Sequence, residues 1–98
     1  MRSIVEKEDC CFLCAEVDKR YNGQNLEVHH IFFGTGKKWL SDEDGLTVHL
    51  CPAHHREGPA AVHKNRLADL YVKAVAQAKY EETHSRDEFI RRYGKSYL

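Results

Sequence analysis

The chain has 98 residues, and its fifteen basic and fifteen acidic residues give a formal net charge of zero at pH 7, so charge alone does not indicate a nucleic-acid partner. A chain of this length forms one domain with a modest core, which a bound metal would support. It has no apolar run of the roughly 18 residues that a membrane helix needs, and its first ten residues have no apolar signal region. We therefore expect a cytoplasmic protein that does not bind membranes.

The N-terminal half predicts a metal knuckle followed by a β-hairpin. Residues 10–14 (CCFLC) form the knuckle, and Asn22-Gly23 predicts a turn between two short extended segments. Residues 26–33 (LEVHHIFF) and 46–50 (LTVHL) are rich in apolar and β-branched side chains, which predicts two strands.

Between these predicted strands we expect irregular structure. Residues 34–38 (GTGKK) predict a flexible basic loop, which could approach a phosphate closely, although most glycine-rich loops have no such role. Residues 41–45 (SDEDG) predict an acidic turn.

The C-terminal half predicts three helices. Pro52 suits the first position of a short helix that begins on a second knuckle. A long amphipathic helix is predicted from about residue 60 to 82, and a capping box beginning at Ser85 predicts a last helix over 86–93. The apolar face of the long helix is expected to contain Leu67, Leu70, Tyr71, Ala74, Val75 and Ala78.

Cysteine spacing predicts a closed zinc site. Two residues separate Cys11 from Cys14 and two separate Cys51 from His54, as in tetrahedral structural zinc sites. In a reducing compartment this pattern favours a metal over disulfides. A register that uses Cys10 in place of Cys11 stays an alternative. Cysteines that only fill the core, or a redox dithiol, explain the pattern less well, because the first ignores the paired spacing and the second lacks a βαβ context.

Histidines are more numerous than one tetrahedral ion can use, which predicts a second, open metal site. His29 and His30 are neighbours on a predicted strand, so their side chains should point to opposite faces. One of them can then bind an ion together with a histidine from the short helix, while the other acts as a general base near neutral pH. His55 follows the second knuckle directly, and His63 lies further along.

The motifs VHHI (28–31) and LCPAHH (50–55), with the later histidine, resemble the HNH endonuclease family, the ββα-metal or His-Me finger nucleases, in the zinc-supported form common in bacteriophage and prophage proteins. The resemblance covers residues 11–63. It implies an α+β fold within one domain of residues 1–98. A zinc-stapled ββα-metal core with a β-hairpin would be followed, over residues 64–98, by a long helix and a short C-terminal helix.

The resemblance implies a metal-dependent DNA endonuclease or nickase that acts in the cytoplasm of a bacterial host cell. It gives His29 the role of metal ligand, His30 that of general base and His55 that of the next ligand, with His63 as the third. Zn²⁺ would occupy the cysteine site, and Mg²⁺, Mn²⁺, Ni²⁺ or Zn²⁺ the histidine site.

The chain departs from the family at one position. The asparagine that normally orients the base just before the second strand is missing, because residues 44–46 are Asp, Gly and Leu. Asp44 or a backbone carbonyl is expected to orient His30 instead. The missing asparagine and the zero net charge favour an alternative function, an inactive zinc module that binds DNA or a protein partner in phage recombination or packaging.

Basic residues flank the predicted site and are candidates for phosphate contacts with DNA, since a local positive field does not require net positive charge. They are Lys37, Lys38, Arg56, Lys64 and Arg66.

Four further residues have simpler expected roles. Trp39 and Tyr71 could stack on bases, but a hydrophobic anchor and a core residue are the expected roles. His49 and His84 are expected to be structural or exposed.

Overall fold

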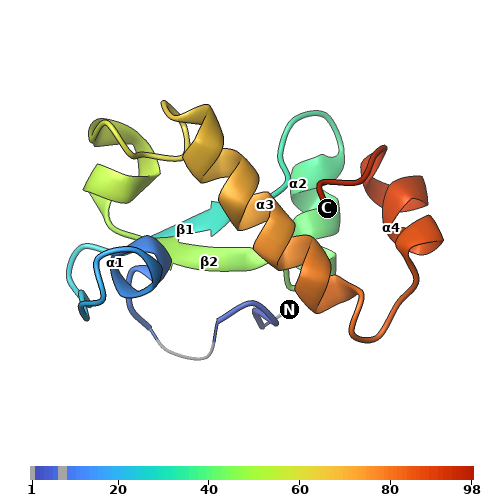
Figure 1. The fold of residues 1–98 in the computed structure, drawn as a ribbon, viewed down its shortest axis with the longest axis horizontal. Helices are drawn as coiled ribbons and strands as arrows, with labels where there is room; N and C mark the ends of the chain where they lie inside the picture. Colours follow the sequence, from blue (N-terminus) through green and yellow to red (C-terminus); the bar gives the residue numbers. More distant parts are fainter. Residues whose placement is uncertain (1, 7–8) are drawn as a thin grey trace.

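The computed structural model describes residues 2–6 and 9–98. At its centre, β1 (Glu27–His30) pairs in antiparallel orientation with β2 (Thr47–Leu50), and helices surround this small sheet (Figure 1). The α+β architecture with an antiparallel pair of strands is confirmed. The helical elements are α1 (Phe12–Glu16), α2 (Lys37–Asp44), the π-helical turn η1 (Ala53–Glu57), α3 (Arg66–Tyr80) and α4 (Arg86–Tyr93).

The connection between the strands contains a helix, so the prediction of a loop and an acidic turn was wrong for most of it. The helix α2 lies between Gly36, with φ 77°, and Gly45, with φ 71°. Both are left-handed conformations that glycine adopts without a Cβ clash. The hydroxyl of Ser41, which is buried, donates to the carbonyl of Phe32 at 2.7 Å and accepts from the Phe32 amide at 2.9 Å. These bonds hold α2 against the chain that follows β1.

The turn predicted at Asn22-Gly23 does not join two strands. The strand β1 begins only at Glu27, and a bend at Gln24 and Asn25 precedes it.

The long helix begins later than predicted and buries a different face. Asn65 caps α3, because its side-chain oxygen accepts from the amide of Ala68 at 3.0 Å. Leu67 is 78 % exposed and Tyr71 44 % exposed, so neither belongs to the core. The buried positions of α3 are Val72, Ala76, Gln77 and Tyr80.

The prediction for the last helix is confirmed. Ser85 and Glu88 form the capping box of α4, and Gly94 ends the helix with φ 95°. Arg92 then ties α4 to the end of α2, with its Nε 2.8 Å from Asp44 Oδ2 and its Nη2 2.7 Å from Glu43 Oε1. Figure 1 shows α2 and α4 together at one end of the molecule.

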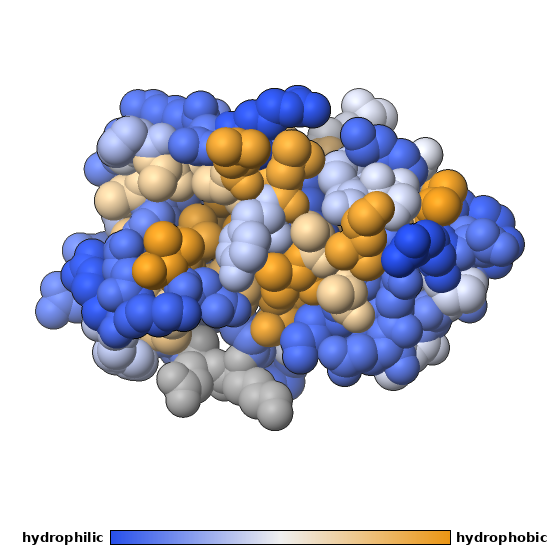
Figure 2. All heavy atoms as spheres, in the orientation of Figure 1, coloured by the Kyte–Doolittle hydropathy of each residue, from blue (hydrophilic) through white to orange (hydrophobic). Residues whose placement is uncertain are grey.

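One hydrophobic cluster joins the elements, and it includes three of the cysteines. Buried residues of β2, α1, α3 and α4 all contribute to it, so the cysteines lie at the edge of the core and not in a separate module. Apolar side chains also remain on the surface over the middle of the molecule (Figure 2). Among the described residues, no helix is both long and apolar enough to cross a membrane.

Candidate metal centres

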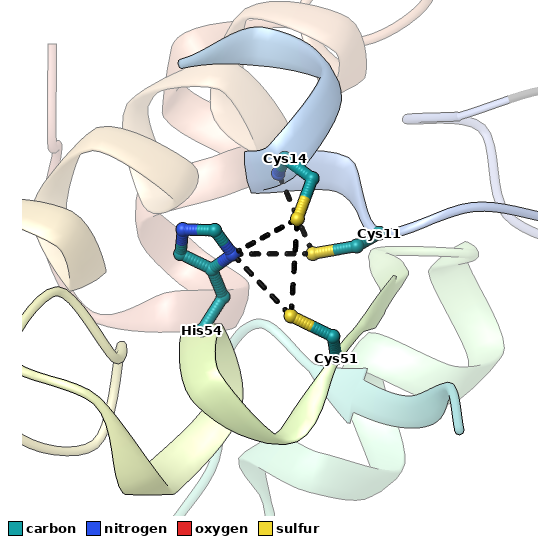
Figure 3. A group of neighbouring side chains, drawn as sticks. All are labelled: Cys11, Cys14, Cys51 and His54. Carbon is teal, nitrogen blue, oxygen red and sulfur yellow. Dashed lines mark hydrogen bonds between the residues drawn. The ribbon is translucent and has the colours of Figure 1, made fainter. Parts of the chain in front are cut away.

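A first group of metal-binding side chains, which we call the thiol cluster, consists of Cys11, Cys14, Cys51 and His54 (Figure 3). His54 Nδ1 lies 3.5, 3.4 and 3.5 Å from the three sulfur atoms, and the sulfurs of Cys14 and Cys51 are 3.8 Å apart. A tetrahedral zinc ion with Zn–S bonds of about 2.3 Å and a Zn–N bond of about 2.0 Å separates its ligand atoms by roughly 3.5–3.8 Å. The spacing therefore fits zinc and is far too long for a disulfide.

Local structure places each member of the thiol cluster. Cys11 is the N-cap of α1, and its sulfur accepts a hydrogen bond from the Cys14 amide at 3.4 Å. Cys51 directly follows β2, and its carbonyl accepts from the amide of His54 at 3.0 Å. The two-residue gaps thus direct both pairs toward one point, as the sequence predicted, with Cys11 and not Cys10 as the member.

Two residues that the sequence did not indicate support the thiol cluster. The side-chain amide of Asn22 donates to the sulfur of Cys14 at 3.8 Å, and its carbonyl accepts from the Cys11 amide at 2.7 Å. Asp18 Oδ2 lies 3.7 Å from Nε2 of His54, on the far side of the ring from the sulfurs. A carboxylate in this position orients a metal-binding imidazole and strengthens it as a ligand.

Ionisation of the buried thiols is uneven. Burial raises the pKa of the Cys14 thiol to about 12, and its hydrogen bond with Cys11 raises it further. Burial also opposes ionisation of Cys51, but hydrogen bonds from the backbone of His54 and from the side chain of Cys11 outweigh it, so the Cys51 pKa is lowered. A dication would stabilise all three thiolates, which couples metal binding to loss of protons and to folding.

A second group, which we call the imidazole cluster, consists of His29, His55 and His63, whose ligand atoms all lie within 4.8 Å of one another. The Nε2 atoms of His55 and His63 are 3.3 Å apart, and the His29 ring centroid is 5.2 Å from each of the other two. Nε2 of His29 is buried and has no hydrogen-bond partner among the described residues. Such an atom costs free energy unless something binds it.

A carboxylate fixes the orientation of His55. Nδ1 of His55 lies 2.6 Å from Oε1 of Glu27. When Nδ1–H donates to this carboxylate, the lone pair of Nε2 is left facing His63, which is the arrangement of a metal-binding histidine. Sequence reasoning missed Glu27, which lies two residues before His29 on β1.

Backbone hydrogen bonds bring His63 to the imidazole cluster despite the Gly58-Pro59 interruption. The amide of Val62 donates to the carbonyl of His54 at 2.9 Å, and the amide of His63 donates to the carbonyl of His55 at 3.2 Å. The segment before α3 is therefore folded back onto η1. His63 keeps an exposed side, which leaves the imidazole cluster open to solvent there.

The imidazoles are held in the neutral form that binds cations. Burial lowers the pKa of His29 to about 3, and the nearby His55 and His63 lower it further. The pKa of His63 is also lowered, first by burial and then by His55. A cation would therefore displace few protons at pH 7.

His30 lies beside the imidazole cluster but outside it. Its Nε2 is 3.4 Å from Oδ1 of Asp42 on α2, and its side chain is 21 % exposed. The expectation that Asp44 orients His30 is not met, because the Asp44 carboxylate accepts hydrogen bonds from Arg92 and from the Tyr93 hydroxyl at 2.6 Å. Asp42, which α2 presents toward β1, takes that position.

A pocket of about 230 Å³ opens over the imidazole cluster. Of the basic residues expected to contact DNA, Lys38 and Arg56 line it, whereas Lys64 donates to the carbonyl of Glu57 at 3.2 Å. Lys37 and Arg66 are not among its lining residues. The lining residues are Val28, His29, His30, Phe33, Lys38, His55, Arg56 and His63.

The remaining histidines are structural, as expected. Nδ1 of His49 lies 2.7 Å from Glu6 Oε1, and His84 stacks on Tyr80 with ring centroids 4.1 Å apart.

Comparison of the chain with protein-family models, with curated proteins and with solved structures gave no match. The resemblance to HNH endonucleases therefore stays a prediction from the motifs, and functional reasoning starts from the two clusters.

Proposed function

We propose that this protein is a metal-dependent endonuclease or nickase that hydrolyses phosphodiester bonds in DNA, as the HNH enzymes do, and that it is phage or prophage encoded. One observation carries the proposal. The imidazole cluster and the His30–Asp42 pair border the same pocket, so a cation site and a candidate base face the same substrate. The thiol cluster, holding zinc, would keep η1 and therefore His55 in place.

The donor set indicates which cation fits the imidazole cluster. Its three ligand atoms are imidazole nitrogens, which suit Zn²⁺ and Ni²⁺ better than Mg²⁺, an ion that prefers oxygen. Such a cation would stabilise the negative charge that develops on the phosphate and on the leaving oxygen.

The protein side chains supply the rest of the chemistry. Asp42 holds His30 through Nε2, which leaves Nδ1 of the same ring to take a proton from the attacking water. Lys38 and Arg56, at the rim of the pocket, supply positive charge for the DNA backbone. Arg56 is also held near the imidazole cluster, with Nε 3.5 Å from Oε1 of Glu27.

The test is plasmid cleavage by His30→Ala in the presence of Mn²⁺, Ni²⁺, Zn²⁺ or Mg²⁺. Loss of a general base costs roughly 10²- to 10⁴-fold in rate, while the fold and the tightly bound zinc should persist. His84→Ala is a matched control, because it removes a histidine that packs on Tyr80 and should leave cleavage unchanged.

Two results would contradict the proposal. If His30→Ala cuts as fast as the parent, the assignment of the base fails. If the parent binds a single tight zinc and cuts with none of these cations, the protein is the alternative zinc module, which binds DNA or a protein partner without cleaving.

A further inference from the structure

Trp39 is the only tryptophan of the chain, and it is 66 % exposed, so it does not anchor the core. It lies on α2, where it lines an open pocket together with His30, Gly36, Lys38 and Asp42. A large exposed aromatic ring in a pocket has unsatisfied apolar surface and marks a binding site more often than a scattered surface residue does.

This pocket is continuous with the pocket over the imidazole cluster. His30 and Lys38 line both of them. A strand whose phosphate lies at His30 would therefore bring its neighbouring nucleotide to Trp39. The approach is open, because nothing lies within 4 Å of the positions that a Cβ would take at Gly34 and Gly36.

We propose that Trp39 stacks on an unpaired nucleobase next to the phosphate bound at His30, so that the preferred substrate is DNA with a locally single-stranded segment. This inference rests on the proposed function for its reaction, but not for its binding. An indole face accepts any base without regard to sequence, and Lys38 beside it supplies charge for the strand. A base inside an intact duplex has both faces covered by its neighbours and must leave the stack to reach a side chain.

Binding can be measured without cleavage. Since the chain has one tryptophan, its fluorescence reports on Trp39 alone. We expect a single-stranded oligonucleotide, without added divalent cation, to quench this fluorescence and to bind more tightly than the same sequence as a paired duplex. An oligonucleotide of abasic sites should bind without this quenching.

Variants are compared by the anisotropy of a labelled single strand. Trp39→Ala should weaken binding by about 5-fold or more, the loss expected for one stacked base, and Trp39→Phe should restore most of it. Tyr71→Ala is the matched control, because Tyr71 is an exposed aromatic residue on α3 that lines a different groove. The proposal is overturned if saturating single strand leaves the fluorescence unchanged, or if Trp39→Ala binds as Tyr71→Ala does.

Cleavage of a gapped and of a fully paired duplex separates this inference from the proposed function. If the parent cuts but Trp39→Ala shows the same preference between the two substrates, stacking fails while the nuclease assignment stands. If no cation supports cleavage but single strands still quench Trp39, stacking stands and the nuclease assignment fails.

Discussion

Glu27→Gln should weaken cation binding at the imidazole cluster while leaving the thiol cluster intact. Glu27 is the only carboxylate within hydrogen-bond distance of His55 among the described residues, with 2.6 Å between Oε1 and Nδ1. Glutamine can still accept from Nδ1–H but carries no charge, and its amide group can also donate. The imidazole then becomes a weaker base, and its Nε2 is no longer restricted to the tautomer that binds a cation.

The structure narrows the expected size of this effect. Removing a carboxylate behind a metal-binding histidine typically costs 10- to 100-fold in metal affinity. The short contact and the buried His55 side chain, which is 6 % exposed, argue for the upper part of this range. Glu27 itself is 39 % exposed and also interacts with Arg56, so water and the arginine moderate the loss. We therefore expect a value nearer tenfold than a hundredfold.

The assay is a calorimetric titration of Ni²⁺ or Zn²⁺ into protein that already carries its tightly bound zinc. Glu57→Gln is the matched control, since it makes the same chemical change at an exposed position of η1. Zinc content by native mass spectrometry should be the same in all three proteins. If Glu27→Gln binds the added cation as tightly as Glu57→Gln, the carboxylate does not support His55 and the reasoning is refuted.

Two further predictions concern stability. Since burial lowers the pKa of His29 to about 3 whereas an unfolded histidine titrates near 6.5, the unfolded chain gains this proton first as the pH falls. The contribution to the free energy of unfolding is complete above about pH 6.5 and falls toward pH 3 by up to about 1.4 kcal/mol per pH unit. Urea denaturation without added cation should show this slope, and parallel curves for the parent and His29→Gln would contradict it. Arg92→Ala should cost about 1–2 kcal/mol, because it breaks the bonds from α4 to Glu43 and Asp44. Arg91→Ala, at an exposed position of the same helix, should stay within about 0.5 kcal/mol, and equal melting temperatures for the two variants would show that the Arg92 contacts contribute nothing.

Sequence reasoning succeeded where the geometry is local. The gaps in Cys11–Cys14 and Cys51–His54 each lie within one turn, so spacing alone determined that both side chains of a pair point the same way. The capping box at Ser85 is likewise a short-range pattern. The grouping of the metal-binding side chains therefore followed from the sequence, whereas the roles given to them stay predictions.

The helix α2 was missed because its sequence, KKWLSDED, has almost no apolar period. Its side facing the core is formed largely by Ser41, and a serine gives no hydrophobic signal. The helix is stabilised by the hydroxyl bonds to Phe32 and by Gly36 and Gly45 at its ends, none of which appears in a hydrophobic pattern.

Long-range contacts explain the other differences. The buried face of α3 includes Gln77, whose side-chain oxygen accepts from the amide of Tyr97 at 2.6 Å, so the C-terminal segment covers a side that its own sequence does not mark as apolar. Glu27 and Asp42 could not be identified as partners of His55 and His30, because each carboxylate comes from another segment. A single acidic residue in a sequence carries no mark of which ring it will meet.

The short turn η1 gives neighbouring residues to two different ions. His54 points into the thiol cluster and His55 into the imidazole cluster, and the amide of Gly58 reaches back five residues to the carbonyl of Ala53. The phase of the backbone here decides which ring goes where. Losing or gaining one residue between Cys51 and His55 would deliver each imidazole to the wrong address, so this turn should tolerate substitutions far better than changes in its length.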